Sequence, residues 1–227
     1  MTDHEHDTAA PIEPANSELG ELQLTTTEAR ILGCLVEKEA TTPDQYPLTQ
    51  NAILTASNQK TSRDPVMNLE AGQVGHALRQ LESRGLVKTV FGSRADRFEH
   101  RLSERYSLTR DQQAVLTLLM LRGAQTAGEL LGRSERLHRF DGADAIHHAL
   151  DRLAQREPSL VIRIPRGPGQ REDRYAHCLC GEPDFSALPV ASSESPSSRG
   201  AAARIDELEL RVAELESIVA RLTSTDD

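Results

Sequence analysis

The pattern that begins a helix occurs twice in this sequence, 84 residues apart. Each copy has a threonine followed three residues later by Glu or Gln, as Thr25 with Glu28 and Thr109 with Gln112. This spacing is a capping box, in which each side chain binds the backbone N–H of the other residue. Apolar residues follow at matching positions: Ile31, Leu32 and Leu35, then Val115, Leu116 and Leu119. The chain therefore contains an internal repeat, which predicts two units of one architecture.

Each copy also contains a later helix that leads into two strands. In the first copy, apolar residues at positions 74, 77, 78 and 81 share one helical face, and Gly85 ends the helix. Residues 86–91 and 97–102 then read as strands around a turn at 92–96. The second copy repeats the His-Ala-Leu sequence of residues 76–78 at 148–150, with strands expected at 160–164 and 174–177. A helix that leads directly into a hairpin is typical of a winged helix-turn-helix.

The predicted fold is mainly α with small β-hairpin wings, an α+β protein with two tandem winged helix-turn-helix domains. Domain 1 covers residues 24–107 and domain 2 covers residues 108–181. Between the outer helices we expect a helix from Leu48 to Ala56, an irregular loop from Asn58 to Asn68, and a capping box at Thr126 and Glu129. Since Trp is absent and aromatic residues make up 3% of the chain, the cores are expected to consist of Leu, Ile, Val and Ala.

The segments outside these domains differ in composition. Residues 1–23 carry acids but no base, and we expect a disordered acidic tail. Residues 182–200 are rich in Pro, Ser and Ala, as in a flexible linker. Residues 201–224 show a heptad pattern with β-branched residues at position a and Leu at position d, which favours a parallel two-stranded coiled coil. These dimerisation residues are Ile205, Leu208, Val212, Leu215, Val219 and Leu222. The alternative is one amphipathic helix that packs on its own body.

The formal net charge of −9 is concentrated at the two ends of the chain, so the repeated body is close to neutral. Such a body can hold a local basic face, although it is not the strongly basic surface of a general nucleic-acid binder. No apolar run of about 18 residues and no secretory leader occurs, so we expect no membrane span and a cytoplasmic location.

Candidate nucleic-acid contacts follow from the winged-helix prediction, in which the third helix enters the major groove and the wing contacts the backbone. In the first unit they are Lys60, Arg63 and Asn68 in the loop, Gln73, Arg79 and Arg84 on the helix, and Arg94 and Arg97 in the wing. The counterparts in the second unit are Arg152, Arg156, Arg166, Arg171 and Arg174. Carboxylates at Glu70, Asp141, Asp144 and Asp151 oppose DNA binding, and Arg-rich helix faces are often only solvated surfaces.

No sequence motif points to catalysis. The chain has no Gly-rich phosphate loop, no His-Glu-x-x-His and no nucleophile elbow, so we predict a protein that is not an enzyme and has no cofactor. Cys178 and Cys180 follow His177, but a structural zinc site usually takes four ligands from two separated pairs. Cys34 is expected to pack as a small apolar residue. No metal site is therefore predicted.

Three segments resemble the YceH-like family of uncharacterised bacterial proteins. They run from Glu37 to Leu48, from Asn58 to Leu69 and from Leu121 to Thr126. The resemblance covers residues 24–182 and implies a pair of winged-helix domains without an established activity. Cys178 and Cys180 lie within this range but are not part of the family's sequence pattern. It does include the Asn58–Leu69 loop, and binding residues are often found on loops.

Two functions remain open from the sequence. The first is a DNA-binding protein, a transcriptional regulator that binds double-stranded DNA as a homodimer. The alternative is a protein-interaction module, because tandem winged helices also serve as docking modules, as in chromosome-segregation proteins that grip a kleisin. The near-neutral body and the acidic residues of both recognition helices favour this alternative.

Overall fold

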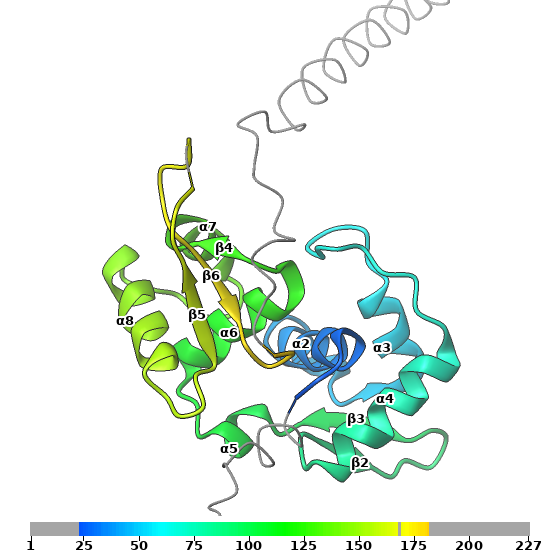
Figure 1. Cartoon of the computed structure of the whole chain (residues 1–227). Coiled ribbons are helices and arrows are strands. Elements are labelled where there is room, and N and C mark those ends of the chain that lie inside the picture. The colour runs from blue at the N-terminus through cyan, green and yellow to red at the C-terminus, as the bar shows by residue number, and fades with distance from the viewer. Residues whose placement is uncertain (1–22, 168, 182–227) are drawn as a thin grey trace, which may run out of the picture. The chain divides into compact units, whose positions relative to one another are not determined.

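The structure is a computed structural model that describes residues 23–167 and 169–181. This part of the chain is an α+β protein, with seven α-helices and two small antiparallel sheets (Figure 1). The coarse fold class predicted from the sequence is therefore confirmed. The predicted acidic tail (apart from Gln23), the linker at 182–200 and the heptads from Ile205 to Leu222 lie outside the described residues.

The two halves of the chain contain their elements in the same order. The first half comprises α2 (Thr26–Thr41), a short 3-10 helix η1 (Pro43–Gln45), β1 (Leu48–Thr49), α3 (Gln50–Ser57), α4 (Ala71–Ser83), β2 (Val87–Val90) and β3 (Arg97–His100). After α5 (Leu102–Tyr106), the second half comprises α6 (Arg110–Arg122), β4 (Gln125–Thr126), α7 (Ala127–Ser134), α8 (Ala143–Ala154), β5 (Val161–Ile164) and β6 (Arg174–His177). The strand orders are β1-β3-β2 and β4-β6-β5.

The helix ends follow the signals in the sequence. The Thr25 backbone N–H donates to the Glu28 carboxylate over 2.7 Å, and the Glu28 N–H donates back to Thr25 Oγ1 over 3.2 Å. Thr126 and Glu129 form the same reciprocal pair at the start of α7. Gly85 follows the end of α4 with a φ of +68°, a conformation that glycine adopts without steric cost. These predicted helix ends are confirmed.

Two expectations for local structure need correction. The predicted helix at 48–56 begins instead with strand β1, because Leu48 and Thr49 pair with Phe98 and Arg97 of β3. The predicted strand at 97–102 ends at His100, and Leu102 begins helix α5. Strands of two residues carry no readable alternation of polar and apolar residues, so the sequence gives no signal for them.

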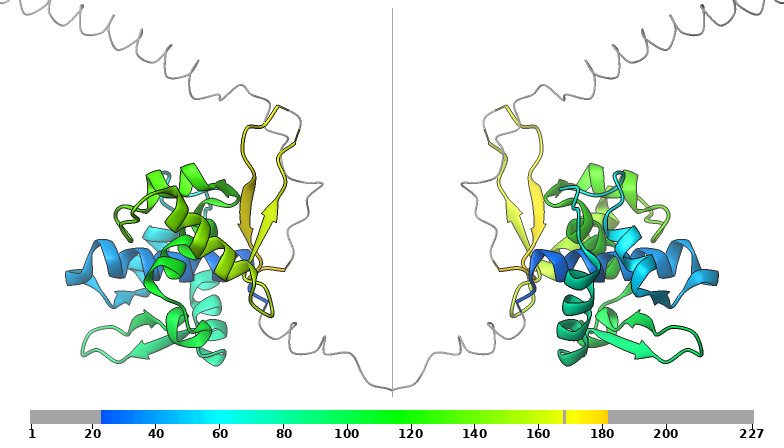
Figure 2. Two further views of the ribbon diagram at one scale, coloured as in Figure 1. Left: turned by 90° about the vertical axis from the view of Figure 1, so that its left-hand side faces the viewer. Right: turned by 90° about the vertical axis from the view of Figure 1, so that its right-hand side faces the viewer.

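Helices α2 and α6 join the two halves. They lie side by side in Figure 1, and a Cβ placed on Gly33 of α2 would come within 3.0 Å of the Leu121 side chain of α6. One continuous cluster of buried apolar residues includes Leu32 and Leu35 from the first half and Leu116 and Leu119 from the second. In Figure 1 the other elements of the two halves lie on opposite sides of this central helix pair, and the two panels of Figure 2 view the molecule from each of these sides. The repeat therefore folds around a shared core.

The helices are short. Over the described ranges, none is both long enough and apolar enough to cross a membrane.

Candidate functional site

Helix α4 presents a polar face opposite a buried apolar face. Val74 and Leu81 are fully buried, as are the other apolar residues of the stripe. On the other face four polar side chains are exposed: Gln73, His76, Arg79 and Gln80. Arg79 makes no ion pair with any described residue. This face of α4 is available to a partner.

The hairpin after α4 carries one cation of the same kind. Arg94 at its tip is exposed and forms no ion pair within the described chain. Arg97, by contrast, donates from Nη1 to the Pro47 carbonyl oxygen over 2.7 Å. Arg84 donates to the Glu28 carboxylate over 2.7 Å and to the Gln23 carbonyl oxygen over 3.0 Å. Of these predicted contact residues, Arg94 is thus free, whereas Arg84 and Arg97 already hold parts of the fold in place.

The loop at residues 58–69 is held closely to the rest of the chain. The side chain of Arg63 is fully buried, with Nη1 3.0 Å from Glu37 Oε1 and Nη2 2.6 Å from Glu37 Oε2. Its Nε also donates to the Ala56 carbonyl oxygen. Asn58 pins the two ends of the loop, because its amide exchanges two hydrogen bonds with the Leu69 backbone. Arg63 therefore stabilises the loop from inside and is left out of the candidate contact surface.

The other two predicted loop residues, Lys60 and Asn68, lie at the exposed surface. The same loop also reaches the second half of the chain. The Asp64 N–H donates to the Leu121 carbonyl oxygen at the end of α6 over 2.9 Å. Sequence reasoning missed the roles of Glu37 and Asn58. The available signal was an acid on α2 that could pair with an Arg in the loop.

The Glu37 carboxyl illustrates the electrostatics of this pair. Burial raises the pKa of Glu37, but the hydrogen bonds and charge of Arg63, with a smaller effect of Lys38, outweigh burial and leave that pKa below its ordinary value. The pKa of Arg63 is raised because Glu37 outweighs the opposing effect of burial. Both residues are therefore charged at neutral pH, so each buried charge is compensated by the other.

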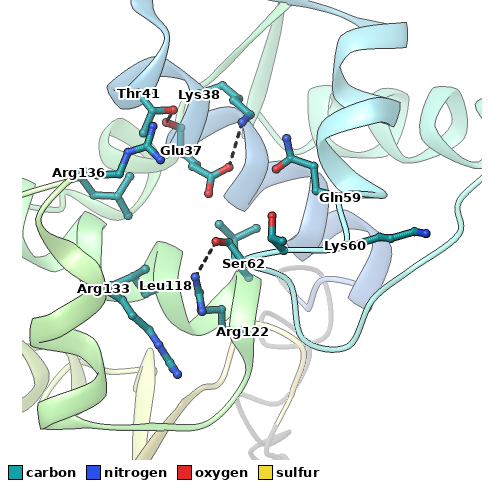
Figure 3. Close-up of a pocket in the computed structure, with 13 residues that line it drawn as sticks. Glu37, Lys38, Thr41, Gln59, Lys60, Ser62, Leu118, Arg122, Arg133 and Arg136 are labelled. Carbon is teal, nitrogen blue, oxygen red and sulfur yellow. Dashed lines mark hydrogen bonds and ion pairs between the residues drawn. The ribbon is translucent and has the colours of Figure 1, made fainter. Parts of the chain in front are cut away.

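A pocket of about 390 Å³ lies next to this loop, between the ends of α2 and α6 and helix α7 (Figure 3). Its lining residues are Glu37, Lys38, Thr41, Gln59, Lys60, Thr61, Ser62, Leu118, Leu121, Arg122, Arg133, Arg136 and Leu137. Five of these side chains are cations and one is an acid. The volume falls within the range of small-molecule sites, about 300–1,000 Å³.

Arg122, at the end of α6, is a partly buried cation of this lining. Its Nη2 donates to Ser62 Oγ over 2.7 Å, and it forms no ion pair within the described residues. Burial lowers the pKa of Arg122, and repulsion from Arg133 and Arg63 lowers it further. The pocket thus has a positive potential that is not fully neutralised by the protein.

The cations of the second half are mostly bound within the fold. Arg163 of β5 pairs with Asp173, and Arg174 donates to the Glu129 carboxylate over 3.0 Å. Arg156 donates to the Tyr106 carbonyl oxygen. The exposed positions of α8 include Asp144 and Asp151 next to Arg152. The face of α8 is therefore more acidic than that of α4.

The side chains around the Cys178–Cys180 segment do not form a cluster of potential metal ligands among the described residues. In the described ranges no group of three or more His, Cys, Asp or Glu residues is arranged to hold a metal ion. Burial and the nearby Glu28 raise the pKa of the Cys180 thiol to about 11, which disfavours the thiolate that metals bind. Cys34 is buried, as expected for a small apolar residue.

The geometry defines a helical protein with an internal repeat, two three-stranded sheets and a basic pocket beside the joint of the two halves. The chain belongs to the family described as "Protein of unknown function, DUF480", whose model matches residues 24–170. The resemblance to the YceH-like family agrees with this membership.

Relatives in other bacteria match over nearly the whole chain. A UPF0502 protein of Xanthomonas campestris pv. campestris (strain B100) is 57% identical over 199 residues, which cover 88% of this chain and 89% of the relative. A UPF0502 protein of Stenotrophomonas maltophilia (strain K279a) is 58% identical over 205 residues, covering 88% of this chain and 94% of the relative. A UPF0502 protein of Xanthomonas axonopodis pv. citri (strain 306) is 56% identical over 199 residues, covering 88% and 89%.

Proposed function

We propose that each half is a winged helix-turn-helix domain and that the first half binds double-stranded DNA, as part of a transcriptional regulator without enzymatic activity. The observation that carries this proposal is the exposed polar face of α4. Gln73 and Arg79 lie on this face, while Val74 and Leu81 hold the opposite face in the core. A third helix with this division can enter the major groove while the hairpin contacts the DNA backbone.

The side chains on this surface suit nucleic acid. Arg79 can donate two parallel hydrogen bonds to a guanine edge or to a phosphate. Arg94 and Lys60 supply further positive charge, and none of the three forms an ion pair with a described residue. In the second half, Asp144 and Asp151 oppose phosphate, so we assign the main contact to the first half.

The test is the salt dependence of DNA binding, measured by fluorescence anisotropy on a pool of random duplexes. The slope of log K against log salt concentration is negative, and each lost phosphate contact reduces its magnitude by about one. We expect the double variant R79Q/R94Q to bind more weakly and to have a slope whose magnitude is smaller by about two. The matched control R110Q/R139Q removes the same charge from exposed positions outside α4 and its hairpin, and should behave as wild type. Equal slopes for all three proteins would contradict the proposal.

A second candidate function is protein docking, and Phe91 favours it. This side chain is 85% exposed just after β2, and among the described residues the other exposed large apolar side chain is Val66. If the hairpin binds a protein, F91A should abolish capture of that partner, whereas R79Q should not. Duplex DNA binding that survives F91A but is lost in R79Q/R94Q supports the first function instead.

Dimerisation through the heptads at 201–224 belongs to the same proposal, because two copies could engage two half-sites. β-Branched residues at position a, such as Val212, and Leu at position d favour two parallel strands. Sedimentation should show a concentration-dependent dimer for the full chain and a monomer after deletion of residues 201–227. A monomer in both cases would favour packing of this helix on its own body.

A further inference from the structure

The basic pocket beside the 58–69 loop has more positive charge than its own residues neutralise. Glu37 is the one carboxylate in the lining, and it is already bound by Arg63 at 2.6 Å and Lys38 at 3.6 Å. Arg133 is bound to Gln125 over 2.7 Å and lies 3.5 Å from Glu129. The remaining cations have no carboxylate partner among the described residues.

Two of these remaining cations lie on different walls of the pocket. Arg122 extends from the end of α6 toward Ser62, and Arg136 follows α7 and turns toward Thr41 (Figure 3). In the same view, Lys60 points outward from the loop. Guanidinium groups bind phosphate through paired N–H donors, and two of them can clamp one phosphate from both sides.

The rest of the lining is suited to an organic group. The partly exposed Leu137 contributes apolar surface, together with the edges of the buried Leu118 and Leu121. Thr61 and Ser62 contribute hydroxyls that can donate or accept hydrogen bonds. A pocket that combines apolar surface with a few convergent polar groups is typical of small-ligand sites. The charge selects an anion, while the leucines favour a ligand with carbon atoms beyond the anionic group.

We propose that this pocket binds a small phosphorylated organic molecule, whose phosphate is held between Arg122 and Arg136. The loop at 58–69 forms one wall, so the buried Arg63–Glu37 pair holds that wall in position. The ligand would contact α2, α6 and α7 together and thereby both halves of the repeat. This inference does not depend on DNA binding.

The experiment uses the full chain and two probes, inorganic phosphate and ribose 5-phosphate, at constant ionic strength set with sodium chloride. Calorimetry should give a saturable binding curve, tighter for ribose 5-phosphate, and the melting temperature should rise with either probe because ligands that bind the folded state stabilise it. R122Q/R136Q should weaken binding roughly tenfold or more, as expected for lost charge-assisted hydrogen bonds. The matched variant R105Q/R139Q removes equal charge from exposed positions outside the pocket and should bind as wild type.

A second variant protects the test against a folding defect in R122Q/R136Q. Thr61 is exposed on the loop, and T61E adds a carboxylate to the pocket wall without removing a structural contact that the structure displays. The T61E protein should bind both probes more weakly than wild type, while its melting temperature in sodium chloride without either probe should equal that of wild type. Absence of saturable binding, or an equal loss in R105Q/R139Q, would overturn the proposal. So would a result in which R122Q/R136Q reduces the salt slope of DNA binding but leaves ribose 5-phosphate binding unchanged, since the pocket would then be part of a DNA surface.

Discussion

The two returning strands β3 and β6 place a histidine at the same position of the repeat, and the two histidines have opposite surroundings. His100 pairs with Val87, and its Nε2 lies 2.7 Å from a Glu39 carboxylate oxygen. His177 pairs with Val161, and its Nδ1 is buried without a hydrogen-bond partner in the described chain. Burial lowers the pKa of His177 to about 4.

The reason lies in the lengths of the two central helices. Helix α2 continues to Thr41 and so carries Glu39, whereas α6 ends at Arg122. The position that corresponds to Glu39 is Gly123, which directly follows α6 and has a φ of +68°. The two copies therefore share their apolar packing positions. Because α6 ends about one turn earlier than α2, His177 has no counterpart of Glu39 as a hydrogen-bond partner.

The connections between the second and third helices differ in the same way. In the first half the connection covers residues 58–70 and is held by Arg63 and Glu37, whereas in the second half it covers residues 135–142. The residue that corresponds to Glu37 in α6 is Leu121, which is buried. An ion pair in one half thus stands where the other half has an apolar contact.

The largest expected effect comes from breaking this ion pair. R63A should lower the free energy of unfolding by about 3–5 kcal/mol, because it leaves the largely buried Glu37 carboxylate with only the more distant Lys38, at 3.6 Å. Urea unfolding would measure this change. The matched control R152A removes an exposed arginine and should stay within about 0.5 kcal/mol of wild type.

The double variant E37L/R63M makes the first half resemble the second. A buried ion pair replaced by apolar residues of similar size often leaves stability unchanged, so E37L/R63M should be more stable than R63A. A double variant as unstable as R63A would mean that the loop depends on the hydrogen bonds of Arg63 to the backbone rather than on the ion pair.

The next largest effect concerns His177 and pH. The folded protein keeps His177 neutral down to about pH 4, whereas the unfolded chain protonates it near 6.5. The unfolded state therefore binds more protons between these two pH values. The contribution of His177 to the free energy of unfolding is fully present above pH 6.5 and is lost as the pH falls toward 4. The loss is roughly 3 kcal/mol for a shift of this size.

This contribution is obtained by comparing urea unfolding of wild type and H177L at pH 7 and pH 4.5. Carboxylates titrate in both proteins, so the difference between them isolates His177. H177L should lose less stability on acidification than wild type, whereas the control H76A, at an exposed position, should follow wild type. An identical pH dependence in H177L would contradict the assignment.

The smallest effect is expected at the corresponding pair in the first half. The hydrogen bond with His100 lowers the pKa of Glu39 despite the opposing effect of burial. The contribution of Glu39 is thus present above the ordinary Glu pKa and is lost as pH falls through the lower folded-state pKa. Because the Glu39 side chain is 49% exposed, E39Q should cost about 0.5 kcal/mol or less at pH 6. A carboxyl NMR titration of wild type would test the direction of the shift.

Local signals in the sequence were sufficient for the longer helices α2, α4, α6 and α8 and for both hairpins. The capping threonines Thr25 and Thr109 and the stop at Gly85 mark positions where the backbone needs a particular side chain, so they can be read without a structure. The two-residue strands β1 and β4 depend on pairing with distant strands, and no local pattern predicts them.

The candidate site was less predictable than the fold. A polar loop with Lys60 and Arg63 suggested two surface cations, but burial separates them, because Glu37 approaches Arg63 from a helix far away in the sequence. The pocket likewise combines residues of α2, α6 and α7 whose proximity arises only from tertiary packing. The spacing of residues within one segment cannot predict which residues of other segments will lie next to it.

The close packing of Gly33 against Leu121 has a consequence for how this repeat can evolve. A duplicated segment usually remains a module that can be lost or transferred by itself. Here a gene fragment encoding residues 24–107 alone would expose Leu32 and Leu35 of α2, the side chains that now share a core with α6. The two copies therefore depend on each other for folding: a substitution in the joint core affects both halves, whereas one on the exposed surface of either half can leave the other unchanged.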